Sequence, residues 1–322
     1  MKLRRIYLIL LPLLMLTMAA GLCFGSAPLS LSDLAAGVGP ARTILLGIRL
    51  PRVLAGLLAG IGLSCAGVLL QTVTANDLAS PNIIGINSGA GLAVILLLSF
   101  APKAAGWLPA GAFCGAFGAA LVILAAGSRL GSSRSGILLI GIAITTLLNA
   151  AISFLSLLDE GILAQYNHFT VGSLRAVRLS DLLIPGIVIF LGFCGSLALA
   201  GRLSVLSLGD AAASALGVRV KGLRIAAMAC AAACAAAVVS FAGLLGFVGL
   251  VVPHIARGLV GERPGRLLPA AALTGGILVI LADLLGRTLF APSELPVGIL
   301  MSLIGAPYFL ILLIRRKHHA GN

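Results

Sequence analysis

The sequence predicts an all-α membrane protein, a polytopic bundle of about ten transmembrane helices. Of its 322 residues, 60% are apolar and 10% are charged, and the mean hydropathy is +1.17, whereas soluble domains carry about 25% charged residues. The apolar residues gather in runs, and most runs match the roughly 20 helical residues that cross a bilayer core. Charged residues lie in short segments between the runs. We therefore expect one transmembrane domain over residues 1–322.

The individual elements follow from these runs in order. Each is expected to be a helix, because lipid offers no partner for backbone N–H and C=O groups. The expected spans are 6–25, 50–74, 83–100, 108–127, 136–157, 182–200, 225–241, 244–256, 268–290 and 296–314. The helix limits inside 225–256 stay open, because Gly243, Gly246 and Gly249 interrupt one long apolar run.

The first span follows the basic start MKLRR and resembles a secretory signal peptide in outline. Its apolar run is longer than a typical signal-peptide core and lacks an A-x-A site before Ser30. We interpret it as the first transmembrane helix.

Close packing between helices is predicted at three pairs of glycines spaced four residues apart. These pairs are Gly56/Gly60, Gly85/Gly89 and Gly111/Gly115. Small residues at this spacing let helix backbones approach each other, which favours helix association in lipid.

Basic residues predict the orientation of the chain. There are 22 Lys and Arg against nine Asp and Glu, a formal charge of +13. If the N-terminus is cytoplasmic, 15 of the 22 bases lie in cytoplasmic segments and seven in outer segments. Because cytoplasmic loops are enriched in Lys and Arg, we expect both termini in the cytoplasm and an even number of spans.

Composition and motifs argue against nucleic-acid binding and catalysis. The bases form short clusters rather than one solvated face, and Trp107 is the single Trp. The sequence contains no HExxH, GxSxG or P-loop motif. Its six cysteines lie in apolar runs without CxxC spacing, which favours buried apolar roles over metal binding. We expect no catalytic residue, metal or cofactor in this chain, so any ATP must be bound by another polypeptide.

An ion-coupled secondary transporter without ATPase partners remains an alternative. Such proteins usually place ionisable groups near the membrane centre. Asp283 instead lies near the predicted outer end of its span, with Arg287 one turn later. Asp77, Asp181 and Asp210 lie at span ends or in loops. A membrane scaffold without transport activity is a third possibility.

One inner loop, residues 201–224, is expected to contain a short helix. Its Ala-rich centre between Leu208 and Val218 favours an amphipathic helix, and Gly217 provides a C-terminal stop. Such a helix lies on the lipid surface or contacts a soluble partner. These residues alone leave both possibilities open.

Several motifs together resemble one known family. The motifs are IRLPR at 48–52, NDLASPNIIGINSGAG at 76–91, VGSL at 171–174, SLGDAAASALGV at 207–218, GLLGFVGLVVPHIAR at 243–257, LADLLGR at 281–287 and ELPVGILMSLIGAPYFLILL at 294–313. In this order and spacing the chain resembles the FecCD-type permeases, the membrane subunits of bacterial ABC importers for ferric siderophores, haem and vitamin B12.

The resemblance implies a transport subunit rather than an enzyme. It implies ten helices per subunit in the bacterial cytoplasmic (inner) membrane, and translocation of a metal chelate such as a ferric siderophore, haem or a corrinoid into the cytoplasm. It also implies a second permease subunit, which we expect to be a copy of this chain. Two cytoplasmic ATPase subunits would bind ATP and Mg, and an extracytoplasmic substrate-binding protein would deliver the ligand.

The same resemblance assigns roles to three groups of residues. ATPase coupling is expected at Ser207, Leu208, Gly209, Asp210, Ala215, Leu216 and Gly217, docking of the binding protein at Arg49, Arg52 and Arg287, and a cytoplasmic gate at Asn76, Asp77, Leu78, Gly131, Ser132 and Ser133. For Arg287, an internal pair with Asp283 is the alternative. The sequence departs from the family at Asp77, where a Pro is usual, and this adds a charge to the expected gate.

Overall fold

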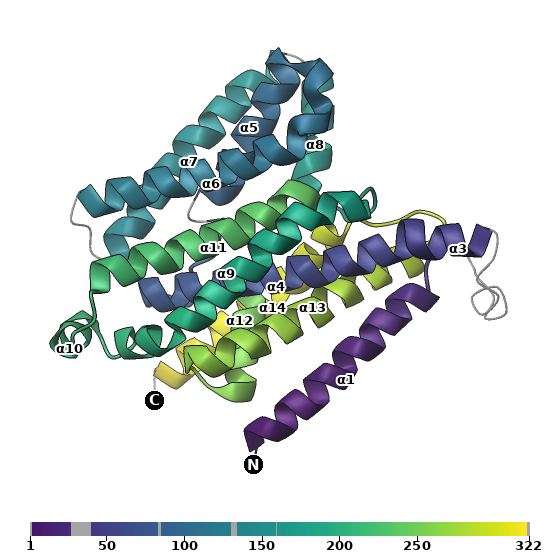
Figure 1. Ribbon diagram of the computed structural model, residues 1–322. Coiled ribbons are helices and arrows are strands. Elements are labelled where there is room, and N and C mark those ends of the chain that lie inside the picture. The colour runs from purple at the N-terminus through teal and green to yellow at the C-terminus, as the bar shows by residue number, and fades with distance from the viewer. Residues whose placement is uncertain (1, 27–39, 83–84, 130–133, 159, 321–322) are drawn as a thin grey trace.

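The computed structural model describes residues 2–26, 40–82, 85–129, 134–158 and 160–320. Within these residues the chain forms helices and no strands, which confirms the predicted all-α class (Figure 1). In chain order the helices are α1 (Lys2–Cys23), α3 (Pro40–Ile44), the π-helix η1 (Leu45–Arg49), α4 (Leu50–Thr74), α5 (Ile86–Phe100), the 3₁₀-helix η2 (Pro102–Trp107), α6 (Leu108–Arg129), α7 (Arg134–Ser156), α8 (Glu160–Val171), α9 (Leu179–Leu206), α10 (Asp210–Ala215), α11 (Val220–Ala242), α12 (Val248–Val260), α13 (Pro264–Thr288) and α14 (Val297–Ala320).

Each of the ten predicted spans coincides with one apolar helix. Among the described residues, seven helices are long and apolar enough to cross a membrane. Three shorter apolar segments, Ile86–Phe100, Val248–Val260 and Val297–Leu312, correspond to the other three predicted spans. The prediction of about ten transmembrane helices is consistent with this arrangement.

The start of the second span differs from the prediction. We expected it at residue 50, whereas the helix runs from Pro40 through α3 and η1 into α4. Pro51 lacks an N–H, and its ring crowds the preceding turn. The wider π-helical turn Leu45–Arg49 lies directly before it, which is how a helix continues past such a residue. Helix α8, in an outer loop, was also not predicted.

The long apolar run within 225–256 breaks between α11 and α12. Gly243 and Phe247 both adopt positive φ, 68° and 63°. The backbone of α8 approaches this break, because Leu244 N donates to Phe169 O at 3.2 Å and Ser173 N donates to Ala242 O at 2.9 Å. A side chain at position 243 would contact Phe169 O, so glycine is required here on two grounds.

The predicted glycine seams lie where helix backbones meet. A Cβ on Gly60 of α4 would overlap the Gly275 carbonyl of α13, and Gly89 of α5 and Gly115 of α6 each face the other's carbonyl. One glycine of each predicted pair thus lies at a close backbone contact, whereas Gly56, Gly85 and Gly111 are nearest to side chains. A further seam, which was not predicted, joins Gly67 of α4 to Gly249 of α12.

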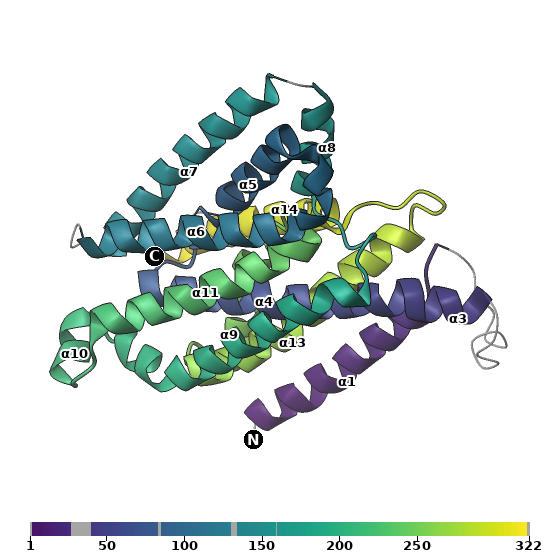
Figure 2. The same cartoon turned by 45° about the horizontal axis from the view of Figure 1, so that its top comes forward.

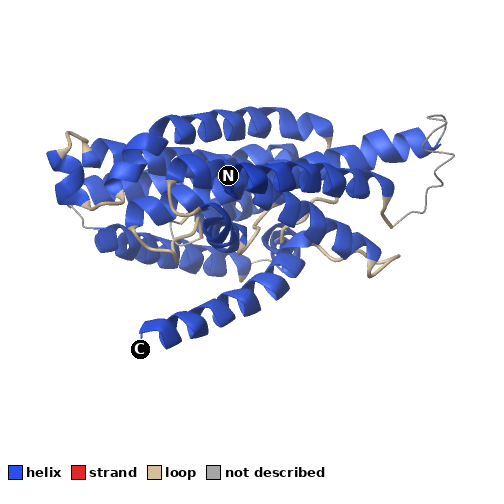
Figure 3. Ribbon diagram, turned by 90° about the horizontal axis from the view of Figure 1, so that it is seen from below, coloured by secondary structure: helices blue, strands red, loops and turns tan. Residues whose placement is uncertain are grey.

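Helix α4 forms the centre of the bundle. In the most apolar 18-residue window of its span 78% of the residues are buried, against 22% in α1 and 17% in α7. Figures 1 and 2 show α4 surrounded by α9, α11 and α13, with α1 and α7 at the periphery. Helix α14 projects from the other helices towards its C-terminus (Figure 3).

The helices define two ends of the bundle. One end carries α10 and the C-terminal end of α14, and the other carries α3 (Figure 1). Tyr7 donates to Arg266 O at 2.7 Å, which places the start of α1 beside the start of α13. The two ends of the bundle are called the α10 end and the α3 end below. The described parts of the predicted cytoplasmic segments belong to the α10 end.

Candidate functional site

Five charged side chains from η1, α4, α13 and the loop before α14 meet at the α3 end. We call Arg49, Arg52, Asp283, Arg287 and Glu294 the arginine–carboxylate cluster. Arg52 Nε lies 2.9 Å from both carboxylate oxygens of Asp283, and its Nη1 lies 2.8 Å from Glu294 Oε2. Arg287 Nε lies 3.6 Å from Asp283 Oδ2. The cluster therefore joins α4 to α13 and to the loop before α14.

Two of these arginines also bind the C-terminal end of α1. Arg49 Nη1 donates to Leu22 O and Cys23 O at 2.8 and 2.6 Å, and Arg287 Nη2 donates to Gly21 O at 2.5 Å. The last carbonyls of a helix lack intrahelical partners and carry partial negative charge. Guanidinium groups satisfy them here, so the cluster fixes α1 against the rest of the bundle.

The structure brings the three predicted docking residues together but buries them. Arg49, Arg52 and Arg287 are 3%, 4% and 3% exposed, and the alternative pair Arg287–Asp283 is present. Their docking role stays a prediction. Sequence reasoning did not single out Arg175 or Glu294. The Arg175 side chain is 74% exposed, and its Nε lies 3.7 Å from Glu294 Oε2.

Glu294 is held ionised by its surroundings in the loop before α14. Partial burial by itself raises its pKa, but hydrogen bonds from Arg52 and Ser26, together with the charges of Arg52 and Arg175, lower the pKa below its ordinary value. Ser26 Oγ donates to Glu294 Oε1 at 2.7 Å. A charged Glu294 therefore connects the end of α1 to Arg52.

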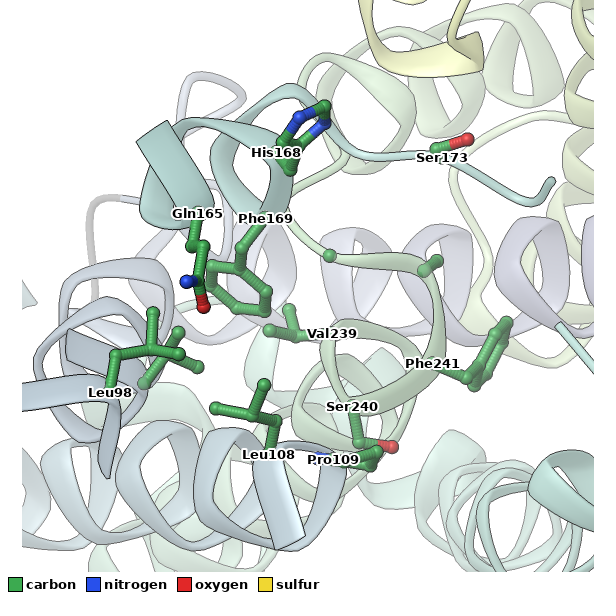
Figure 4. A pocket seen from close by; sticks show the side chains of 13 residues that line it. Leu98, Leu108, Pro109, Gln165, His168, Phe169, Ser173, Val239, Ser240 and Phe241 are labelled. Atoms are coloured by element: carbon green, nitrogen blue, oxygen red, sulfur yellow. The ribbon is translucent and has the colours of Figure 1, made fainter. Parts of the chain in front are cut away.

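Two neighbouring cavities of about 390 and 460 Å³ lie at the α3 end. They share His168 and Ser173. Figure 4 shows the smaller one, where the Gln165 side chain lies beside the Phe169 ring and Leu98, Leu108 and Val239 contribute apolar side chains. The larger one is lined by Arg52 and Glu294 of the cluster. Together the two cavities form an opening at the α3 end, called the mouth below, with an apolar side and a charged side.

At the opposite end, the predicted gate segment is attached to α12. Arg257 Nη1 lies 3.2 Å from Asp77 Oδ1, and Arg257 Nη2 donates to Gln71 Oε1 at 2.5 Å. Gln71 is buried, and its Nε2 donates to Gly249 O at 3.3 Å. Leu78 N donates to the Asn76 side chain at 2.9 Å, a local turn. The carboxylate that replaces the usual Pro thus has a basic partner.

The other half of the predicted gate, Gly131, Ser132 and Ser133, lies outside the described residues. The structure therefore places Asn76, Asp77 and Leu78 alone, at the end of α4.

The predicted coupling segment forms a short helix at the tip of the α10 end. Helix α10 (Asp210–Ala215) lies between two glycines with positive φ, 106° at Gly209 and 79° at Gly217. Arg224 Nη2 of α11 donates to Asp210 Oδ2 at 2.6 Å. Leu208 and Leu216 keep 68% and 65% of their surface exposed.

The remaining predicted coupling residues, Ser207, Ala215 and Gly217, are exposed beside these leucines. Buried Ala213 holds the inner side of the helix. The segment thus has a buried, fixed inner side and an apolar outer surface, which suits contact with a further protein.

Possible metal ligands are scattered through the described ranges. No group of three His, Cys, Asp or Glu side chains gathers there in a way that could hold a metal ion.

Comparison with known proteins gave consistent matches along the chain. The model of the FecCD transport family matches residues 13–315. The iron(3+)-hydroxamate import system permease protein FhuG of Bacillus subtilis is 38% identical over 302 residues, covering 90% of this chain and 89% of that protein. The hemin transport system permease protein HmuU of Yersinia pestis is 39% identical over 286 residues, covering 87% and 85%.

The fold also matches a solved structure, described as an inward-facing conformation of a metal-chelate type ABC transporter. The TM-score is 0.87 at 32% sequence identity, covering 97% of this chain and 99% of the solved chain.

Proposed function

The chain belongs to the FecCD transport family, and from this premise we propose that it is the membrane-spanning permease subunit of an ABC importer. Its substrate is a metal chelate, a ferric siderophore, haem or a corrinoid such as vitamin B12. A substrate-binding protein delivers the chelate, and ATP hydrolysis on partner subunits drives it into the cytoplasm. The observation that carries the proposal is the match of family and fold over nearly the whole chain.

Helix α11 provides a direct connection between the two ends in this proposal. It begins beside α10, where Arg224 holds Asp210. It ends at Ala242, where Val239 and Ser240 line the smaller cavity of the α3 end. A partner ATPase that moves α10 would therefore also move a wall of the mouth, as alternating access requires.

The partner contacts follow from what each end presents, which is exposed leucines at the α10 end and an excess of positive charge, with Arg175 exposed, at the α3 end. The leucines of the coupling segment would enter a groove of the ATPase, and the ATPase would bind ATP and Mg. At the α3 end the arginine–carboxylate cluster together with Arg175 holds four bases against two acids. This excess of positive charge suits acidic side chains of a binding protein, which would dock faster through long-range attraction.

The gate in this proposal is the segment Asn76–Leu78 with residues 131–133. The pair Asp77–Arg257 would hold the first part of the gate against α12. Translocation would then require this contact to shift or break.

A second copy of the chain would complete the pathway. Helices α7 and α14 expose large apolar residues to their surroundings, among them Leu147 and Phe154 on α7 and Leu303 and Leu310 on α14. These faces are our candidates for the contact between two permease subunits in the bacterial inner membrane, with both termini in the cytoplasm.

Reconstitution tests the proposed function. The chain, its ATPase partner and its binding protein are placed in liposomes, and uptake of labelled ferric hydroxamate, haemin and cobalamin is measured. We expect ATP-dependent uptake of one of these chelates, with none when the ATPase or the binding protein is omitted. Uptake by the chain alone under an ion gradient would contradict the proposal and support a secondary transporter.

A further inference from the structure

A third cavity lies at the α10 end and has no part in the proposed pathway. It measures about 340 Å³ and is formed by α6, α7, α11 and α10. Leu124 of α6, Ile137 of α7 and Met228 of α11 form an apolar side. These three side chains are largely buried, with exposed fractions of 9%, 9% and 2%. Lys221 and Arg224 of α11 line the same cavity.

The charges around this cavity are not balanced. Arg224 donates through Nη2 to Asp210, while its Nε is buried and has no hydrogen-bond partner among the described residues. Lys221 lies one turn earlier on α11, and Asp210 is the single carboxylate among the described residues that line the cavity. Two cations thus face one anion among the described lining residues, with a buried donor left over, and an unmade buried hydrogen bond is unfavourable.

The position of the two bases increases the imbalance. They lie in the first turns of α11, which has no acidic residue in its first turn and no side-chain cap. The N-terminal end of a helix carries partial positive charge, so cations are unfavourable there and an anion is favourable. A negatively charged group between Lys221 and Arg224 would compensate both.

The apolar side of the cavity distinguishes a lipid from a soluble anion. Phosphate alone would gain nothing from Leu124, Ile137 and Met228. A phospholipid would place its phosphate against the bases and its first methylene groups against the apolar side chains. Basic pockets between transmembrane helices at the membrane surface bind anionic head groups in this way. The volume is at the small end of ligand pockets, about 300–1,000 Å³, which suits a head group rather than whole acyl chains.

We propose that this cavity binds the head group of an anionic phospholipid from the leaflet at the α10 end. Because Asp210 begins α10 and bonds to Arg224, the bound lipid would help to fix α10 in place. The proposal does not depend on which chelate the chain carries or on the ATPase.

Native mass spectrometry of the purified full chain tests this binding. The chain is exchanged into phosphatidylcholine with and without phosphatidylglycerol, and the retained lipid is counted. We expect selective retention of phosphatidylglycerol. Lys221→Gln should weaken it about fivefold, since one basic residue near a membrane surface contributes about 1 kcal/mol. Ser128→Trp, which fills the cavity without changing its charge, should weaken retention to a similar degree.

The matched control is Arg202→Gln, which removes one exposed base from α9 at the same end but outside the cavity. It should leave retention unchanged. Equal losses in the Arg202 and Lys221 variants would show general surface attraction and overturn the proposal. Displacement of phosphatidylglycerol by inorganic phosphate would show a site for free anions and would overturn it too. If the Ser128 variant fails to fold, the Lys221 and Arg202 variants alone decide.

Discussion

Arg52 shows how a buried charge is tolerated at the end of a membrane bundle. A carboxylate or guanidinium removed from water is costly unless it is paired and hydrogen-bonded. Arg52 meets this condition through its planar fork, with Nε on Asp283 and Nη1 on Glu294. A Lys ammonium could not reach both acids in the same geometry. The side chain therefore has a structural role whether or not a binding protein docks nearby.

Arg52→Gln is predicted to destabilise the chain strongly. Removing one partner of a buried ion pair costs about 3–5 kcal/mol, because the other charge stays buried. Without Arg52, Asp283 would have Arg287 as its one remaining basic partner in the cluster. We expect a clear fall in the temperature of unfolding, measured by the loss of monodisperse protein on heating in detergent. Arg175→Gln is the control, since exposed pairs contribute about 0–1 kcal/mol. A stable Arg52 variant would contradict the structural role and leave docking as its function.

The lowered pKa of Glu294 predicts that the unfolding free energy of the chain falls in acid. Its pKa in the folded chain lies below the ordinary value of 4.5, so its contribution to the unfolding free energy is complete above that value. The contribution is lost as the pH falls through the lowered pKa. We expect Glu294→Gln to reduce the pH dependence of the unfolding temperature in this acidic range. An unchanged pH profile in the variant would show that Glu294 does not stabilise the α3 end.

The gate segment shows the limits of sequence reasoning at the residue scale. The replacement of Pro by Asp77 was visible, but its consequence was not, because Arg257 lies 180 positions away in the sequence and contacts Asp77 through folding alone. The same holds for Arg52 and Glu294. Long-range pairs of charges cannot be read from spacing along one chain.

At the scale of elements, glycine seams decide how closely α4 can pack. Gly60→Ala should destabilise the chain by about 1–3 kcal/mol, the usual cost of overpacking, since the added Cβ would overlap the Gly275 carbonyl of the neighbouring helix. Thermal unfolding of the purified variant measures this. Gly118→Ala on α6 is the matched control, because its Cβ would meet nothing within 4 Å. If both variants unfold at the wild-type temperature, the seam does not limit packing.

The coupling segment depends on the backbone of Gly217. Its φ of +79° is unfavourable for any residue with a branched side chain, so Gly217→Val should distort the end of α10. We expect less ATPase to co-purify with this variant from detergent. Gly201→Val, at an open helical position, should retain the ATPase. Normal co-purification of the Gly217 variant would remove the support for a coupling role.

Elements were predicted well where hydropathy alone determines them. The ten apolar runs gave ten helices because lipid leaves the backbone no other choice. The extension of α4 through η1 was missed because Arg49, Pro51 and Arg52 interrupt the apolar run where the span was expected to begin. Helix α8 was missed because its residues are of mixed polarity and give no long apolar run.

At the scale of the whole molecule, the two ends differ in what they expose. The α3 end buries its charges in the arginine–carboxylate cluster around a mouth. The α10 end exposes leucines and basic side chains around α10. Helix α11 links a cavity at one end to the coupling segment at the other. In the proposed mechanism, a movement of α10 would therefore reach the mouth through this one helix.

This asymmetry predicts which end faces the cytoplasm. The predicted cytoplasmic segments, which we assign to the α10 end, hold 15 of the 22 Lys and Arg residues, and such an excess marks cytoplasmic segments. In a variant without the six native cysteines, Ala212→Cys and Gly106→Cys place one thiol at each end, both at exposed positions. A membrane-impermeant maleimide added to spheroplasts should label position 106 directly and position 212 only after permeabilisation. The reverse pattern would show that the chain has the opposite orientation in the membrane. In that orientation α10 could not contact a cytoplasmic ATPase.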